Sequence, residues 1–117
     1  MKFEYEMIFC IVNAGFSETV MEAAKESGAG GGTVFSARGT ANKEAETIFK
    51  ITIQPEKEVV MILVPAEIKE KVLHALYKKA GLQTPGQGIA FAMPVDGLAG
   101  LSLKDHSKTE LPETAEA

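Results

Sequence analysis

Four short segments of the chain carry apolar residues in the patterns typical of β-strands. They are rich in aromatic and β-branched side chains and are bounded by turn-forming residues such as Asn13 and Gly15. We therefore predict four strands: Tyr5 to Val12, Thr33 to Ala37, Val59 to Val64 and Ile89 to Val95.

A helix is predicted between the first two strands. Ser17 or Thr19 can cap its start, and Gly28 ends it. Thr19 and Glu22 also have the spacing of a capping box.

A second helix is predicted after Pro65, because proline suits the first turn of a helix, and Gly81 closes it. Its expected apolar face consists of Ile68, Val72, Leu73, Leu76 and Tyr77.

The stretch between the second and third strands begins as a polar segment. Arg38 to Glu46 has neither a helical nor a strand period, so we predict a loop. Thr47 to Ile53 alternates like a ribbon, and Gln54-Pro55-Glu56-Lys57 is predicted to be a turn.

The order strand, helix, strand, strand, helix, strand predicts an α+β ferredoxin-like fold, with a four-stranded antiparallel sheet and both helices on one face. The first strand is apolar on both sides, with Tyr5, Met7, Phe9 and Ile11 on one side and Ile8, Cys10 and Val12 on the other. Helices cover only one face, so the second apolar face predicts a homo-oligomer with its sheets facing inward.

The composition limits the class of protein. The 117 residues are 45% hydrophobic and 24% charged, which suits one compact domain, assigned here to residues 1–104. The net charge of −4 argues against a broad binding surface for nucleic acid. Residues 105–117 hold four acidic residues, one lysine and no aromatic residue, and we expect a mobile acidic tail there.

The sequence favours a cytoplasmic protein without membrane insertion. The longest apolar run, Val59 to Pro65, is much shorter than the ~20 residues that span a bilayer. Glu4 and Glu6 stand where a signal peptide would be uncharged. One cysteine and two histidines are too few for an internal disulfide or a closed zinc site, so no metal ligands are expected.

Four pieces of the sequence, in order, resemble the PII signal-transduction proteins (the nitrogen regulatory protein PII superfamily). The pieces are Ile11-Val12 running into Gly15-Phe16, Gly32 to Gly39, Pro55 to Pro65, and Pro85 to Phe91. The resemblance implies a homotrimer with its sheets inside and adenine nucleotides in the clefts between subunits. It also implies that a T-loop between the second and third strands signals to a partner protein.

The resemblance also implies which residues bind the nucleotide. Thr33 resembles a threonine that reaches the adenine from a neighbouring subunit, and Leu63 resembles a position whose backbone contacts the base. The end of the second strand would lie beside the phosphates, and its residues are Ser36, Arg38, Gly39 and Thr40.

The turn Gly86-Gln87-Gly88-Ile89 is a second candidate for phosphate contact, because glycines let backbone N–H groups approach an anion. The same glycines are also compatible with a role in turn formation alone. Arg38 is the only arginine, and its forked guanidinium suits phosphate, although a solvated surface arginine is the alternative.

This sequence departs from the family pattern at several positive charges. Ile89 stands where the family usually has a lysine, and Leu101-Ser102-Leu103 stands where it commonly has arginines. Each missing charge-assisted contact is worth roughly 1.5–3 kcal/mol, so AMP or ADP is favoured over tightly bound ATP. The loop Gly39–Gln54 has no tyrosine and no serine, so the family's modification sites are absent.

We therefore expect a non-enzymatic PII-like signalling protein that binds AMP, ADP or ATP, with Mg²⁺ left open. Its loop Gly39–Gln54 would regulate a partner, and the family suggests the cytosolic face of a membrane transporter. Two alternatives remain at this point. One is a ligand-free structural trimer resembling the CutA proteins, and the other is an acylphosphatase-like enzyme built on Arg38 with Asn42 or Asn13.

Overall fold

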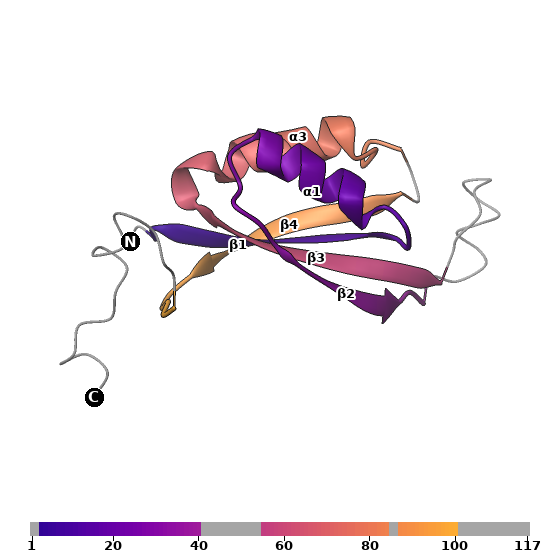
Figure 1. The fold of residues 1–117 in the computed structure, drawn as a ribbon, viewed down its shortest axis with the longest axis horizontal. Helices are drawn as coiled ribbons and strands as arrows, with labels where there is room; N and C mark the ends of the chain where they lie inside the picture. The colour runs from indigo at the N-terminus through magenta and orange to yellow at the C-terminus, as the bar shows by residue number, and fades with distance from the viewer. Residues whose placement is uncertain (1–2, 41–54, 85–86, 101–117) are drawn as a thin grey trace.

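A computed structural model describes residues 3–40, 55–84 and 87–100 of the chain. These residues form four strands, two α-helices and one short 3-10 helix (Figure 1). In chain order they are β1 (Tyr5–Asn13), α1 (Ser17–Glu26), β2 (Thr33–Arg38), β3 (Glu56–Pro65), η1 (Ala66–Ile68), α3 (Lys69–Lys79) and β4 (Gly88–Val95). The predicted order of elements is confirmed, while the expected ribbon at 47–53 and the acidic tail lie outside the described residues.

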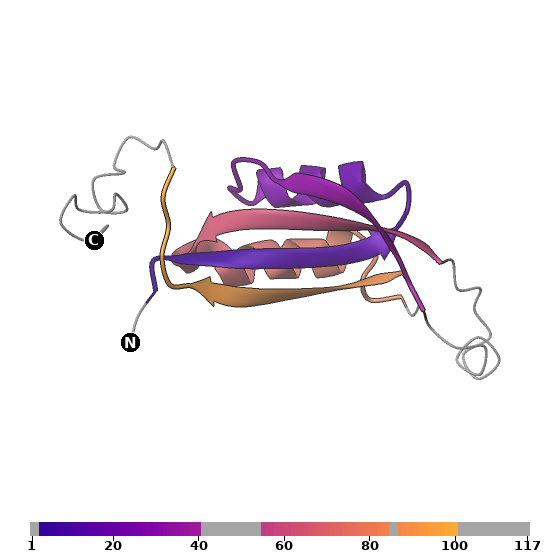
Figure 2. The ribbon, with the colours of Figure 1, turned by 90° about the horizontal axis from the view of Figure 1, so that it is seen from below.

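The four strands form one antiparallel sheet in the order β2-β3-β1-β4. Central β1 pairs with β3 on one side and with β4 on the other, and β2 pairs with the outer edge of β3. Both α-helices lie on one face of this sheet (Figures 1 and 2). This is the predicted α+β ferredoxin-like arrangement.

The core lies between the sheet and its two helices. Even-numbered residues of β1 and β3 face the helices, and Ile8, Cys10 and Ile62 are completely buried there. Val20 of α1 and Leu76 of α3 close this layer from above. Burial raises the pKa of the Cys10 thiol to about 11, so the reactive thiolate is scarce at neutral pH.

The opposite face of the sheet, which we call the open face, is apolar across all four strands. Its larger apolar residues are Tyr5, Met7, Phe9, Ile11, Phe35, Val59, Met61, Leu63, Ile89, Phe91, Met93 and Val95. The register also places Thr33, Ala37 and Lys57 on this face. The ring of Phe91 stacks on that of Phe9, with centroids 5.4 Å apart and planes 16° from parallel. The predicted two-sided apolar character of β1 is confirmed, and no described element of this chain covers the open face (Figure 2).

The predicted turn at Gln54–Lys57 is wrong for its second half. β3 begins at Glu56, which pairs with Arg38, and Lys57 pairs with Asn13 of β1. Pairing on both sides extends the strand past the point where the nearby proline suggested a turn. Arg38 is accordingly the last residue of β2 and not the first residue of a loop.

The predicted side-chain cap of the first helix is also wrong. The N-cap position is Phe16, and neither Ser17 nor Thr19 supplies a capping bond. The side-chain Oε1 of Glu58 accepts hydrogen bonds from the backbone N–H of Gly15 (3.0 Å) and of Ser17 (3.2 Å) instead. These partners are 43 and 41 residues apart, so a local sequence pattern cannot indicate the contact.

The helix ends follow the sequence more closely than the starts do. Gly28 (φ +111°) and Gly81 (φ +79°) adopt left-handed conformations just after α1 and α3, as predicted. On α3, Leu76 is buried but Tyr77 is 49% exposed, so Tyr77 is wrongly assigned to the apolar face. It lies one residue, or about 100°, further around the helix.

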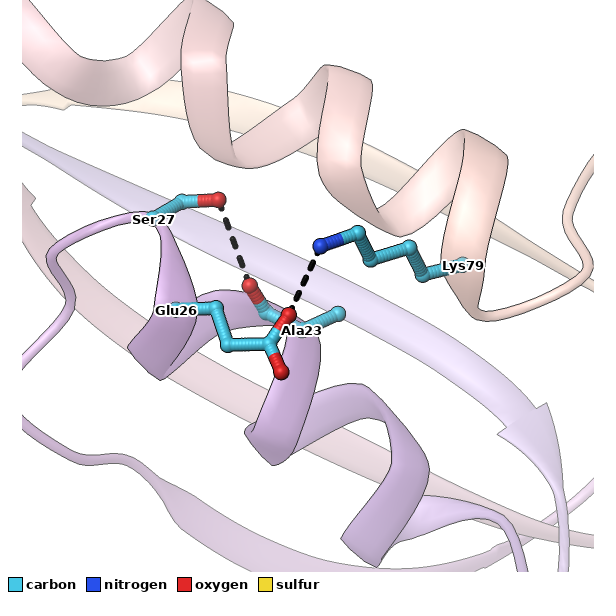
Figure 3. A network of polar contacts seen from close by, with 4 residues as sticks. All are labelled: Ala23, Glu26, Ser27 and Lys79. Atoms are coloured by element: carbon cyan, nitrogen blue, oxygen red, sulfur yellow. Dashed lines mark hydrogen bonds and ion pairs between the residues drawn. The ribbon is translucent and has the colours of Figure 1, made fainter.

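An ion pair between Glu26 of α1 and Lys79 of α3 joins the helices at the surface, with Nζ and Oε1 2.7 Å apart (Figure 3). In the same view the Ser27 hydroxyl donates to the Ala23 carbonyl at 3.2 Å. The Lys79 and Glu26 side chains are 58% and 61% exposed, so water screens the pair.

We expect Lys79→Met to lower the free energy of unfolding by less than about 0.5 kcal/mol, because exposed pairs contribute little. Urea denaturation measures the change. Lys78→Met is the matched control, since Lys78 is the exposed neighbour on the same helix. A loss several times that of the control would contradict the prediction.

Candidate functional site

The segment between β2 and β3 leaves and re-enters the sheet at one point. The backbone N–H of Gly39 donates to the carbonyl of Pro55 at 2.6 Å, one residue beyond the pair Arg38–Glu56. A Cβ at Gly39 would lie 2.9 Å from Cε of Lys57, so glycine lets the lysine side chain pass close to the backbone here. The exposed Arg38 side chain stands at this entrance, as the sequence predicted.

Lys57 is a second positive charge at this end of the sheet, and it was not among the candidates predicted from the sequence. Its Nζ donates to Oδ1 of Asn13 at 2.6 Å in a part-buried contact. The signal that could have found it is strand parity, because Lys57 lies two residues before Val59 and therefore on the same face.

Gly88 lies in a strand and not in a turn. It is the first residue of β4 and pairs with Val12, at a φ of +157°. A Cβ there would come within 2.6 Å of the Ile11 carbonyl oxygen and 3.0 Å of Leu82 Cδ2. Packing alone thus accounts for this glycine. The side chain of Ile89 is on the open face and is 57% exposed.

The remaining residues of this candidate turn precede β4. The backbone N–H of Gln87 donates to the Thr84 carbonyl at 3.2 Å, which closes a tight turn as predicted. Gly86, the other glycine of the candidate phosphate contact, lies outside the described residues.

The candidate phosphate residues lie at the same end of the sheet but on its two opposite edges. Arg38 and Gly39 belong to the β2 edge, and Gln87 and Gly88 belong to the β4 edge. Across this end of the sheet Arg38 pairs with Glu56, Lys57 pairs with Asn13, and Val12 pairs with Gly88. The two candidates on the β2 edge and the two on the β4 edge therefore lie at the same end. Three strand spacings separate the two edges, which is ~14 Å.

The other candidates lie elsewhere on β2 and β3. Thr33, the first residue of β2, pairs with Met61 near the middle of β3. It lies ~17 Å along β2 from Arg38. Leu63 is two residues beyond Met61 and shares the open face with it. Ser36 and Thr40 are exposed near the end of β2. One chain therefore does not bring the candidate adenine contacts and phosphate contacts together.

At this end of the sheet, the carboxyl group of Glu58 has a lowered pKa. The hydrogen bond from the Gly15 backbone is the main cause that lowers the pKa of Glu58, and the hydrogen bonds from Ser17 add to it. Partial desolvation opposes the shift. The side chain is therefore a carboxylate at neutral pH.

The described residues contain no group of three or more histidine, cysteine or acidic side chains that could hold a metal ion. Within the same residues, no helix is long and apolar enough to cross a membrane.

A family model described as "Nitrogen regulatory protein P-II" matches residues 5–102. The match takes in every strand and helix described above and most of the chain. The chain belongs to the PII family. The resemblance drawn from the four sequence pieces is thereby confirmed.

Solved structures share this PII fold. The structure of CPII from Thiomonas intermedia K12, bound to ADP, AMP and acetate, has a TM-score of 0.60 and 13% identity, and the alignment covers 81% of this chain and 90% of that one. The crystal structure of Arabidopsis thaliana PII bound to citrate has a TM-score of 0.67 and 22% identity, over 97% of this chain and 94% of that one. At these identities they establish a common fold. No curated protein matched the sequence.

PII proteins are regulatory proteins and not enzymes, so the acylphosphatase-like alternative is set aside. The position of Arg38 also argues against an acylphosphatase site, because Arg38 is the last residue of the second strand, β2. An acylphosphatase needs its arginine in the connection after the first strand, and here Asn13-Ala14-Gly15-Phe16 contains no cation.

Proposed function

We propose that this PII protein is a sensor that binds an adenine nucleotide between neighbouring subunits of a homotrimer. The observation behind this proposal is that the candidate phosphate contacts lie on two opposite edges of the sheet. Arg38 and Gly39 lie at one edge of the sheet and Gln87 and Gly88 at the other, both at the same end. In a ring of copies, the β2 edge of one subunit can face the β4 edge of the next.

The open face supports the assembly. It is apolar on all four strands, and Ile89, Phe91 and Met93 would each leave a large hydrophobic side chain in water in a single chain. Apolar patches of this kind are rare on monomers. Packing three sheets inward removes these side chains from water and gives a closed, symmetric assembly. It also fits the helices, which occupy only the outer face.

The charges at this end of the sheet support a lightly charged ligand. Arg38 lies on the helix-facing side of the sheet beside Glu56 and Glu58, and Lys57 lies on the opposite face, bonded to Asn13. One cation beside two carboxylates suits one or two phosphate groups better than a triphosphate. AMP and ADP are therefore favoured over ATP, and CPII of the same fold is described as bound to ADP and AMP.

The loop Gly39–Gln54 is the proposed signalling element. Both of its ends attach beside Arg38, through the Gly39–Pro55 hydrogen bond, so ligand binding at Arg38 can alter how the loop leaves the sheet. We expect the protein to act in the cytoplasm, with the cytosolic face of a membrane transporter as its partner. Membership of the PII family supports this choice of partner.

Isothermal titration calorimetry with AMP, ADP, ATP and cyclic AMP tests the proposed ligand. We expect micromolar affinity for at least one of them. Arg38→Ala should weaken it by about 10- to 100-fold, because a charge-assisted phosphate contact contributes roughly 1.5–3 kcal/mol.

Lys71→Ala is the matched control for Arg38→Ala, since it removes an exposed cation from α3 and should leave affinity unchanged. No heat with any of the four nucleotides would contradict the proposed function. Such a result would favour the ligand-free structural trimer.

A further inference from the structure

Four consecutive residues, Pro55–Glu58, tie the loop entrance to the start of helix α1, and we call them the β3 clamp. Their bonds, in order, are Gly39 N–H to Pro55 O (2.6 Å), Ala14 N–H to Glu56 O (3.0 Å), Lys57 Nζ to Asn13 Oδ1 (2.6 Å), and Gly15 and Ser17 N–H to Glu58 Oε1 (3.0 and 3.2 Å). Every residue of the clamp therefore holds either Gly39, just after β2, or the segment from the end of β1 to the start of α1.

We propose that Glu58 is a positioning residue that couples the base of the loop Gly39–Gln54 to the first turn of α1. Helix α1 has no side-chain cap of its own, and its N-cap residue is Phe16. The first amides of a helix need acceptors, and a carboxylate is favoured there by the helix dipole. Glu58 provides that acceptor from a strand that directly follows the loop.

The arrangement makes the cap conditional on the position of β3. Glu58 reaches α1 from a part of β3 in which Lys57 pairs with Asn13 and the Glu56 carbonyl accepts from Ala14 N–H. A ligand or partner that shifts the first residues of β3 must stretch or release the bonds to Gly15 and Ser17. The start of α1, which is far from the loop in sequence, then reports the state of the loop base.

Amide hydrogen exchange without any ligand tests the cap. We expect Glu58→Ala to speed exchange at Gly15 and Ser17 several-fold, with Glu58→Gln in between because its amide oxygen still accepts a hydrogen bond. The amides of Ile8 and Cys10, in the central strand β1 that is paired on both sides, are the internal reference for global unfolding. Glu22→Gln, an exposed acid on α1, is the control variant. No change at Gly15 and Ser17, or an equal rise at Ile8 and Cys10, would overturn the proposal.

The coupling is tested from the other side of the strand. Lys57→Met removes the bond to Asn13 and leaves the carboxylate of Glu58 in place. If the clamp acts as a unit, exchange at Gly15 and Ser17 should rise in this variant too. Unchanged exchange at these two amides would show that the cap is independent of the rest of the clamp, and the coupling would be wrong.

A nucleotide experiment extends the test and rests on the proposed function. Saturating ADP should slow exchange at Gly15 and Ser17 in the wild type but not in Glu58→Ala. Coupling is reciprocal, so the variant should bind ADP more weakly although Glu58 has no assigned ligand contact. Binding of ADP with equal slowing in both proteins would overturn the coupling. A lack of heat with ADP would contradict only ADP as the ligand, because the two ligand-free experiments decide the clamp.

Discussion

Phe91→Asp is expected to convert the proposed homotrimer into monomers. Phe91 lies on the open face, stacks on Phe9 and is 40% exposed in a single chain. If three open faces pack together, the substitution places three carboxylates in a space without water. A buried, unpaired charge costs far more than the contacts of one side chain supply. Sedimentation velocity should show the mass fall from three times the 12.5 kDa chain to one.

Val34→Asp is the matched control for this experiment. Val34 is 43% exposed, close to the value for Phe91, but it belongs to the helix-facing side of β2. We expect it to leave the assembly intact, since the proposed trimer is built on the open face. A trimer that survives Phe91→Asp would contradict inward packing of the sheets. The circular dichroism spectrum should stay near that of the wild type, because Phe91 lies outside the buried core.

The open face was predictable from sequence because a strand has a period of two. Tyr5, Met7, Phe9 and Ile11 could be assigned to one face without knowing what lies opposite them. The helix ends at Gly28 and Gly81 were predictable for a similar reason, because a left-handed residue after a helix is a local requirement.

The contacts of Lys57 and Glu58 could not be predicted in this way. They join residues 44, 43 and 41 positions apart, and they follow from the register between β1 and β3. The proline at position 55 gave a local turn signal, and pairing with β1 and β2 overrides that signal. Arg38 could be named as a candidate because its chemistry suits phosphate, but its separation from Gln87 and Gly88 depends on strand order.

Gly88→Ala is expected to reduce the free energy of unfolding by about 3 kcal/mol, from overpacking and a strained backbone together. The added Cβ would lie 2.6 Å from the Ile11 carbonyl oxygen and 2.9 Å from Val12 Cγ1. Ile11 belongs to the central strand, which is paired on both sides, so its backbone cannot move aside without loss of sheet bonds. A φ of +157° adds strain for any residue with a side chain.

Denaturation of Gly88→Ala without nucleotide, at one fixed protein concentration, separates packing from ligand contact. Gly97→Ala is the control, because Gly97 is exposed and a Cβ added there would have nothing within 4 Å, so alanine should be tolerated. If Gly88 served only to approach a phosphate, its variant would unfold like the control and lose only nucleotide affinity. If Gly88→Ala is destabilised without ligand, the reason is that β1 leaves no room for a side chain at the first residue of β4. Pairing of Gly88 with β1 then also fixes the backbone N–H groups that the start of β4 could offer to a phosphate.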